Sequence, residues 1–283
     1  MSAMNPDLSL RLAAAVEQMP AFPKSVQKIL DLTRDVACSP KDLVQVIDRD
    51  PVVTVKVLRV VNSAYYGLAN QITSVDHAVV FLGFNTIKNL ALSIAAIGML
   101  PHNQLAGFDG QRYLLHSLST AAIARQLAQR LPDADVHDCF IAGLLHDFGK
   151  VVVAQFMPTE FRRSMELSLW SSRPLHVALF EVIRVDHAEV GAMLAEKWRF
   201  ASNLVESIRH LHTPEQCDTD MLACVFAANQ ISQRLGLDYG GCLVDAPLPA
   251  TVEKRLGGQI DALQASLGDL GPLLNESRLF SSF

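Results

Sequence analysis

Apolar residues recur every three or four positions along most of this chain, whereas the strict alternation of apolar and polar residues typical of half-buried strands is missing. Such spacing puts apolar side chains on one face of successive helices. It therefore predicts an all-α, multi-helical fold with an N-terminal helical module packed on a second helical module. The polar stretch 101–110 is the best boundary between the modules. We accordingly divide the chain into residues 1–105, residues 106–240 and a C-terminal helical extension, 241–283.

Polar capping residues mark where several helices begin. Asp50, followed by Pro51, predicts a helix that runs to about Asn62, although valine, a β-branched residue, is frequent in it. The other helices that the pattern predicts cover residues 39–47, 74–83, 85–100, 113–128, 138–148, 159–171, 174–184, 187–197, 201–210, 220–235 and 261–267.

Composition limits the function classes. Half of the residues are hydrophobic, which is ample for a sizeable core. The net charge of -5, with lysine and arginine scattered, argues against direct nucleic-acid binding. Because the start has no apolar leader and no run approaches the ~18 apolar residues of a membrane span, we expect a cytoplasmic protein that does not bind membranes. The odd number of cysteines, five, favours reduced thiols.

The chemistry is concentrated at His146 and Asp147, which stand at the end of an apolar segment. Burying an imidazole and a carboxylate there is costly unless something satisfies them. Both are ligands for Fe, Mn, Zn or Mg. His116 shares a helix face with Thr120 and Ile123, so its ring should point toward the core. The three residues could hold one divalent metal ion, or they could form a network of protein hydrogen bonds without a cofactor.

Lys150 has two interpretations. It could cap the end of a helix that stops at Gly149, which we favour, or it could pair with Asp147. His187 has two equally good interpretations, as an N-terminal helix residue and as a metal ligand.

Several sequence features together resemble the HD superfamily. In its metal-dependent phosphohydrolases a lone His, a His-Asp pair and a distant Asp converge on one metal, and the matching residues here are His116, His146, Asp147 and Asn229. The wider pattern is closer to the HDOD family, which the phrases at residues 19–23, 43–51, 56–67, 78–83 and 186–191 resemble in the right order. This resemblance covers roughly residues 15–235, and implies an N-terminal module of the HDOD region and an HD-like module.

The departures from the superfamily pattern weaken the metal site. Asn229 replaces a charged carboxylate with a neutral amide, which lowers metal affinity. At a second metal site Leu211 occupies the first position of the family's paired histidines, while His212 is kept. His187 and His210 are further candidate ligands that could supplement His212 at this site. No Gly-Tyr-Pro triplet is present, so cleavage of cyclic di-GMP is not supported.

The resemblance implies a non-catalytic regulatory module that acts through contacts with signalling proteins, as members of this bacterial family are generally taken to do. Two alternatives stay open. One is a metal-dependent phosphohydrolase acting on a nucleotide or phosphoester, in which Lys150 would contact phosphate. The other is a metal- or ligand-sensing domain. The sequence predicts no particular partner and no oligomeric state.

Overall fold

The computed structural model describes residues 6–21, 24–34, 39–62, 71–100, 107–237, 239–240, 246–271, 275 and 277–278. Throughout these residues the regular structure is helical and no strand occurs, which confirms the all-α prediction. Part of the predicted boundary, residues 101–106, and two of the cysteines, Cys38 and Cys242, lie outside this part of the chain. Cys139, Cys217 and Cys224 are free thiols.

Contacts between residues divide the chain into two compact units. The larger unit comprises Met1–Pro20 and Pro101–Gly271, and the smaller unit comprises Ala21–Leu100 and Pro272–Phe283. Both units are assembled from segments distant in sequence. The three-part division expected from the sequence stays a prediction.

The smaller unit contains five helices among its described residues: α2 (Lys24–Arg34), α3 (Pro40–Asp48), α4 (Pro51–Val61), α5 (Val75–Leu82) and α6 (Phe84–Gly98). Asp50 caps α4 by accepting hydrogen bonds from the backbone amides of Val52 and Val53. At the other end of α4, the Asn62 side chain bonds both the N–H and the C=O of Ile72 at 2.7 Å. The valine-rich segment is thus a helix fixed at both ends.

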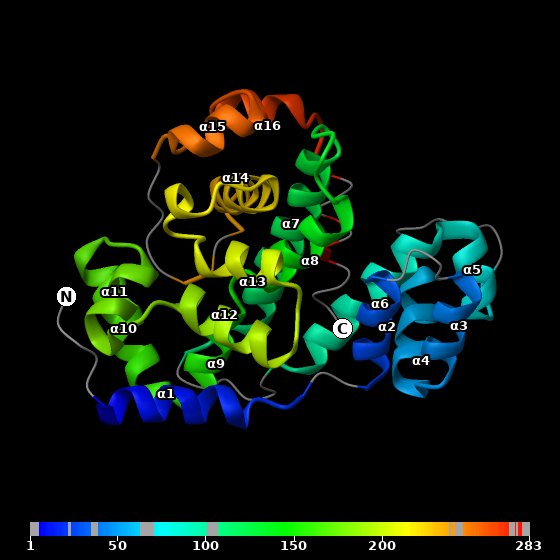
Figure 1. The fold of residues 1–283 in the computed structure, drawn as a ribbon, viewed down its shortest axis with the longest axis horizontal. Coiled ribbons are helices and arrows are strands. Elements are labelled where there is room, and N and C mark those ends of the chain that lie inside the picture. The colour runs from blue at the N-terminus through cyan, green and yellow to red at the C-terminus, as the bar shows by residue number, and fades with distance from the viewer. Residues whose placement is uncertain are drawn as a thin grey trace. The chain divides into compact units, whose positions relative to one another are not determined.

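The larger unit contains α1 (Pro6–Gln18), α7 (Gly110–Ala128), α8 (Val136–Leu145), α9 (Phe148–Phe156), α10 (Pro158–Ser171), α11 (Leu175–Ile183), α12 (His187–Lys197), α13 (Ser202–Arg209), the short 3-10 helix η1 (Pro214–Gln216), α14 (Asp220–Arg234), α15 (Ala250–Leu256) and α16 (Ile260–Ser266). Helix α7 packs against α8 and α14, and α9 packs against α12 (Figure 1). These two packed groups carry the residues of the site described below.

Glycine allows the closest approaches between these helices. A Cβ on Gly143 of α8 would lie 2.7 Å from the Cα of Ala121 on α7, and a Cβ on Gly149 of α9 would lie 1.9 Å from the carbonyl oxygen of His187. Real Cβ atoms do not approach backbone atoms so closely. Both positions therefore need glycine because a neighbouring backbone occupies the space of a side chain.

The helix predicted over residues 138–148 is wrong in its extent. Helix α8 ends at Leu145, His146 and Asp147 form a turn, and a second helix, α9, begins at Phe148. Periodicity missed this break because residues on both sides of the turn are buried and apolar. The turn lets the His-Asp pair face the neighbouring helices α7 and α12.

Helix α1 was also missed, as was α2. Lys197 holds the C-terminal end of α1, because its ammonium group donates to the carbonyl oxygens of Val16 (2.9 Å) and Met19 (3.1 Å). The indole N–H of Trp198 donates to the carbonyl oxygen of Pro20 at 3.1 Å. A cation at a helix C-terminus stabilises the helix. Because Lys197 lies far from α1 in the sequence, no local pattern indicates this contact.

One stretch, Val136–Phe156, is long and apolar enough to cross a membrane by length and composition alone. It comprises α8, the turn and α9. Of its most apolar 18-residue window, 89% is buried. Its apolar character is thus accounted for by packing in the core of the larger unit.

Candidate functional site

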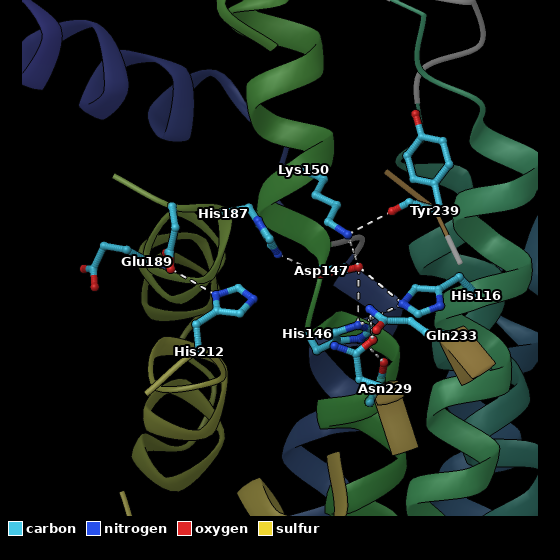
Figure 2. A network of polar contacts seen from close by, with 12 residues as sticks. His116, His146, Asp147, Lys150, His187, Glu189, His212, Asn229, Gln233 and Tyr239 are labelled. Carbon is cyan, nitrogen blue, oxygen red and sulfur yellow. Dashed lines mark hydrogen bonds and ion pairs between the residues drawn. The ribbon is translucent and has the colours of Figure 1, made fainter. Parts of the chain in front are cut away.

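Three buried side chains converge at the turn between α8 and α9. His116 comes from α7, His146 follows the last residue of α8, and Asp147 precedes α9. The Nε2 atoms of the two histidines are 3.3 Å apart, and they lie 3.4 Å and 3.3 Å from Oδ2 of Asp147. Among the described residues, these three are the one group of His, Cys, Asp or Glu side chains whose donor atoms all lie within 4.8 Å of one another. We call His116, His146 and Asp147 the triad (Figure 2).

The spacing of the triad suits a divalent cation. Ligand atoms bound about 2.0–2.1 Å from a tetrahedral ion lie roughly 3.3–3.4 Å apart, as these three do. The ring orientation of His146 adds a second argument. Its Nδ1 lies 2.7 Å from the carbonyl oxygen of Gly143, and because a carbonyl only accepts, Nδ1 must donate. Nε2 of His146 then faces the Asp147 carboxylate, and the two groups need a cation or a proton between them.

Asp147 is held as an anion by several neighbours. Lys150 donates to its Oδ2 at 2.6 Å, and Nε2 of His187 lies 3.0 Å from its Oδ1. Burial, the largest single influence, raises the pKa of Asp147, but the charges of His146 and Lys150 and the hydrogen bonds from the histidines together hold it well below its usual value of 3.8. Burial lowers the pKa of His116, so its ring is neutral at pH 7.

The preferred interpretation of Lys150 as a helix cap is wrong. Gly149 does not end a helix, because it is the second residue of α9, and Lys150 lies in the first turn of that helix. Its ammonium group is buried and donates to Asp147 and, at 3.0 Å, to the carbonyl oxygen of Tyr239. The alternative, pairing with Asp147, describes the structure.

Asn229 lies on α14 and lines the same pocket as Asp147, Lys150 and Gln233. Its side-chain oxygen accepts a hydrogen bond from Nε2 of Gln233 at 3.2 Å. In Figure 2 both amides are drawn beside the triad. The residue at the fourth ligand position is therefore close to the triad, but its oxygen is already engaged by another side chain.

Two of the candidates for a second metal site, His187 and His212, line this pocket, which has a volume of about 230 Å³. His212 is 3.0 Å from Asp186 through Nδ1, and its ring meets that of His187 edge to face at 4.7 Å. Each ring is thus already bonded to a carboxylate, His187 to Asp147 and His212 to Asp186. His210 instead contacts Glu206 and Thr213. Among the described residues, His187 and His212 belong to no group of three acidic, cysteine or histidine donor atoms that all lie within 4.8 Å of one another.

Acid should destabilise the protein through His187, whose pKa is lowered from 6.5 to about 4, chiefly by burial. Between these two pH values the His187 side chain binds more protons in the unfolded chain than in the folded one. Its contribution to the free energy of unfolding is therefore fully present above about pH 6.5 and falls by about 3 kcal/mol as the pH is lowered toward 4. Urea unfolding at several pH values across this range measures the loss. His187→Gln should reduce the dependence on pH, whereas the exposed control His77→Gln should not. The same pH dependence in both variants would contradict this assignment.

Sequence reasoning missed three residues of the site. His176, at the start of α11, stacks on His212 with ring centres 3.9 Å apart, and Ser232 of α14 contacts Nδ1 of His116 at 3.2 Å. Ser232 could have been found, because it stands one helical turn after Asn229 and shares its face. Tyr239 acts through its backbone carbonyl, and His176 through tertiary stacking, so no local signal exists for either.

Comparison with known proteins shows the family to which the chain belongs. The model of the HDOD domain matches residues 19–214. An uncharacterized protein of Treponema pallidum (strain Nichols) is 28% identical over 208 residues, which are 72% of this chain and 40% of that protein. Ribonuclease Y of Mycoplasma mycoides is 25% identical over 176 residues, 61% of this chain and 35% of the enzyme. The chain therefore spans less than half the length of these curated relatives.

The fold has a counterpart among solved structures. An HDOD domain protein with unknown function from Geobacter sulfurreducens has a TM-score of 0.77 and 24% identity, with 96% of this chain and 97% of that chain covered. This likeness shows the fold alone. HDOD domains are related to HD phosphohydrolases, in keeping with the buried His-Asp pair. Since the family model covers more than half of the sequence, the chain belongs to the HDOD family.

Proposed function

We propose that this chain is a regulatory module that holds one divalent cation at the triad, acts by contact with another signalling protein, and hydrolyses no substrate. The observation that carries the proposal is the state of Asp147. It is the carboxylate of the triad, and it is already neutralised by the Lys150 ammonium at 2.6 Å and bonded by His187 at 3.0 Å.

The charge at the triad supports binding more than catalysis. A divalent ion here would have two imidazole rings, one shared carboxylate and, from Asn229, at most an amide oxygen that Gln233 already engages. Fewer anionic ligands lower the affinity for hard cations such as Mg²⁺, whereas imidazole suits Zn or Fe. The donor set therefore favours an imidazole-binding metal such as Zn or Fe.

A second candidate function is a metal-dependent phosphohydrolase. The pocket of about 230 Å³ favours it, because Asp147 and Lys150 line that pocket beside the triad. A divalent ion supplies Lewis-acid polarisation of a phosphoryl oxygen when it is bound. Lys150, whose ammonium already bonds Asp147 and the Tyr239 carbonyl, lines this pocket and would then orient the phosphate.

Metal analysis tests the proposal. We expect protein purified without chelator to carry a divalent metal, to melt at a lower temperature after chelation, and to recover when the metal is returned. His146→Ala should abolish uptake. Neither the metal-bound nor the chelated wild-type protein should hydrolyse nucleotides or simple phosphodiesters. Asn229→Asp adds a carboxylate and should raise metal occupancy without producing hydrolysis.

Two outcomes would decide against regulation by a bound metal. Hydrolysis proportional to bound metal, lost in His146→Ala and increased in Asn229→Asp, would establish the phosphohydrolase. Failure of the wild-type chain to take up Zn²⁺, Fe²⁺ or Mn²⁺, with no change in melting temperature, would leave the triad as a hydrogen-bonded network of protein groups.

A further inference from the structure

The two histidines of the triad are held from behind by different kinds of group. Behind His146 stands the carbonyl oxygen of Gly143, which can only accept, so the Nδ1–H tautomer of His146 is fixed. Behind His116 stands the hydroxyl of Ser232, 3.2 Å from Nδ1. A hydroxyl can donate or accept. His116 and Ser232 are both completely buried, so water does not compete for this contact.

The direction of the Ser232 hydrogen bond determines what faces the centre of the triad. If the hydroxyl donates to Nδ1, the proton of His116 is on Nε2, which lies 3.3 Å from Nε2 of His146 and 3.4 Å from Oδ2 of Asp147. That proton then separates the facing acceptors. If Nδ1 donates to the hydroxyl, the Nε2 lone pair also faces inward, and three acceptor atoms surround one point.

We propose that Ser232 is a positioning residue that selects the tautomer of His116: it donates when the triad holds a proton and accepts when the triad holds a cation. The inference rests on the proposed function because it takes the triad as the cation site. A metal-bound imidazole is a stronger N–H donor than a free one, so the hydrogen bond to Ser232 is worth more with metal than without it. Ser232 lies on α14, which also carries Asn229, so one helix supplies both residues.

Zinc affinity tests the proposal. Competition with a chromophoric chelator should show that Ser232→Ala binds Zn²⁺ about 10- to 100-fold more weakly than the wild type. Ser232→Thr, which keeps a hydroxyl, should bind close to the wild type. Ser119→Ala is the matched control, because Ser119 is a completely buried serine on α7 whose hydroxyl lacks a partner among the described residues. Its affinity should not change.

Nitrogen-15 NMR of the histidine rings provides a readout that loss of packing would not imitate. In the wild type, the His116 proton should be on Nε2 without metal and on Nδ1 after Zn²⁺ is added. In metal-free Ser232→Ala the proton should stay on Nε2, which still faces Oδ2 of Asp147, and the Nδ1 resonance should shift because the hydroxyl that bonded it is gone. The wild-type titration alone tests the switch if a variant does not fold.

The outcomes separate the two proposals. Wild-type Zn²⁺ uptake together with unchanged affinity in Ser232→Ala, or with one His116 tautomer in both states, would overturn the role of Ser232 and leave the proposed function standing. Absence of Zn²⁺ uptake by the wild type would overturn the proposed function and the metal-linked switch. The Nδ1 resonance of metal-free Ser232→Ala would then still report whether the Ser232 hydroxyl bonds His116.

Discussion

Replacing Gly149 by alanine should destabilise the larger unit severely. The added Cβ would lie 1.9 Å from the carbonyl oxygen of His187 and 2.7 Å from the amide nitrogen of Gly191. Both obstacles are backbone atoms of the α12 segment, so no side-chain rotation relieves them. Helices α9 and α12 would have to separate, which also removes the contact between His187 and Asp147. We expect a loss of about 4 kcal/mol or more in the free energy of unfolding.

Gly98→Ala is the control for Gly149→Ala. A Cβ at Gly98 meets no heavy atom within 4 Å, and this glycine lies at the end of helix α6. Alanine there should be neutral or slightly stabilising, because it restricts the unfolded chain. Urea unfolding followed by circular dichroism measures both variants. Equal stability of Gly149→Ala and the wild type would show that α9 and α12 are not held at this distance in solution.

Local signals along the chain predicted most of the helices. Asp50 and Ser74 cap α4 and α5 as expected, by accepting backbone hydrogen bonds. Local signals failed at the turn between α8 and α9, because apolar residues continue through it and α9 is buried on all sides. They also failed for α1, whose C-terminal end depends on Lys197, a residue distant in sequence. Boundaries that depend on tertiary contacts leave no local pattern.

The site could be predicted only as far as single helices specify it. The spacing of residues on one helix face correctly predicted that the His116 side chain points toward the core, where it is completely buried. The partners of Asp147 were harder to predict. His187 reaches Asp147 only because α12 approaches the backbone of Gly149, and that approach depends on two glycines, Gly149 and Gly191. A sequence shows the glycines but not which helices they bring together.

Asp147→Asn should destabilise the protein by about 3–5 kcal/mol, because it leaves a buried cation without its counter-charge. Asparagine keeps one acceptor oxygen, but it carries no charge to balance the buried ammonium of Lys150, whose other partner is the Tyr239 carbonyl. That one oxygen can accept either from Lys150 or from Nε2 of His187, whereas the carboxylate now accepts from both. Unfolding should be measured after chelation, so that loss of metal does not contribute to the difference.

A second substitution separates this loss of charge balance from a simple loss of packing. Lys150→Met removes the cation and keeps an apolar stem of similar length, so the double variant Asp147→Asn/Lys150→Met buries neither charge of the pair. If the cost of Asp147→Asn comes from the unpaired ammonium, the double variant should be more stable than Asp147→Asn by about 2 kcal/mol. If the changes in the free energy of unfolding caused by the two substitutions simply add, the Asp147 carboxylate stabilises the fold through its contacts with the histidines instead. The ion pair at 2.6 Å would then contribute little to stability, despite its burial.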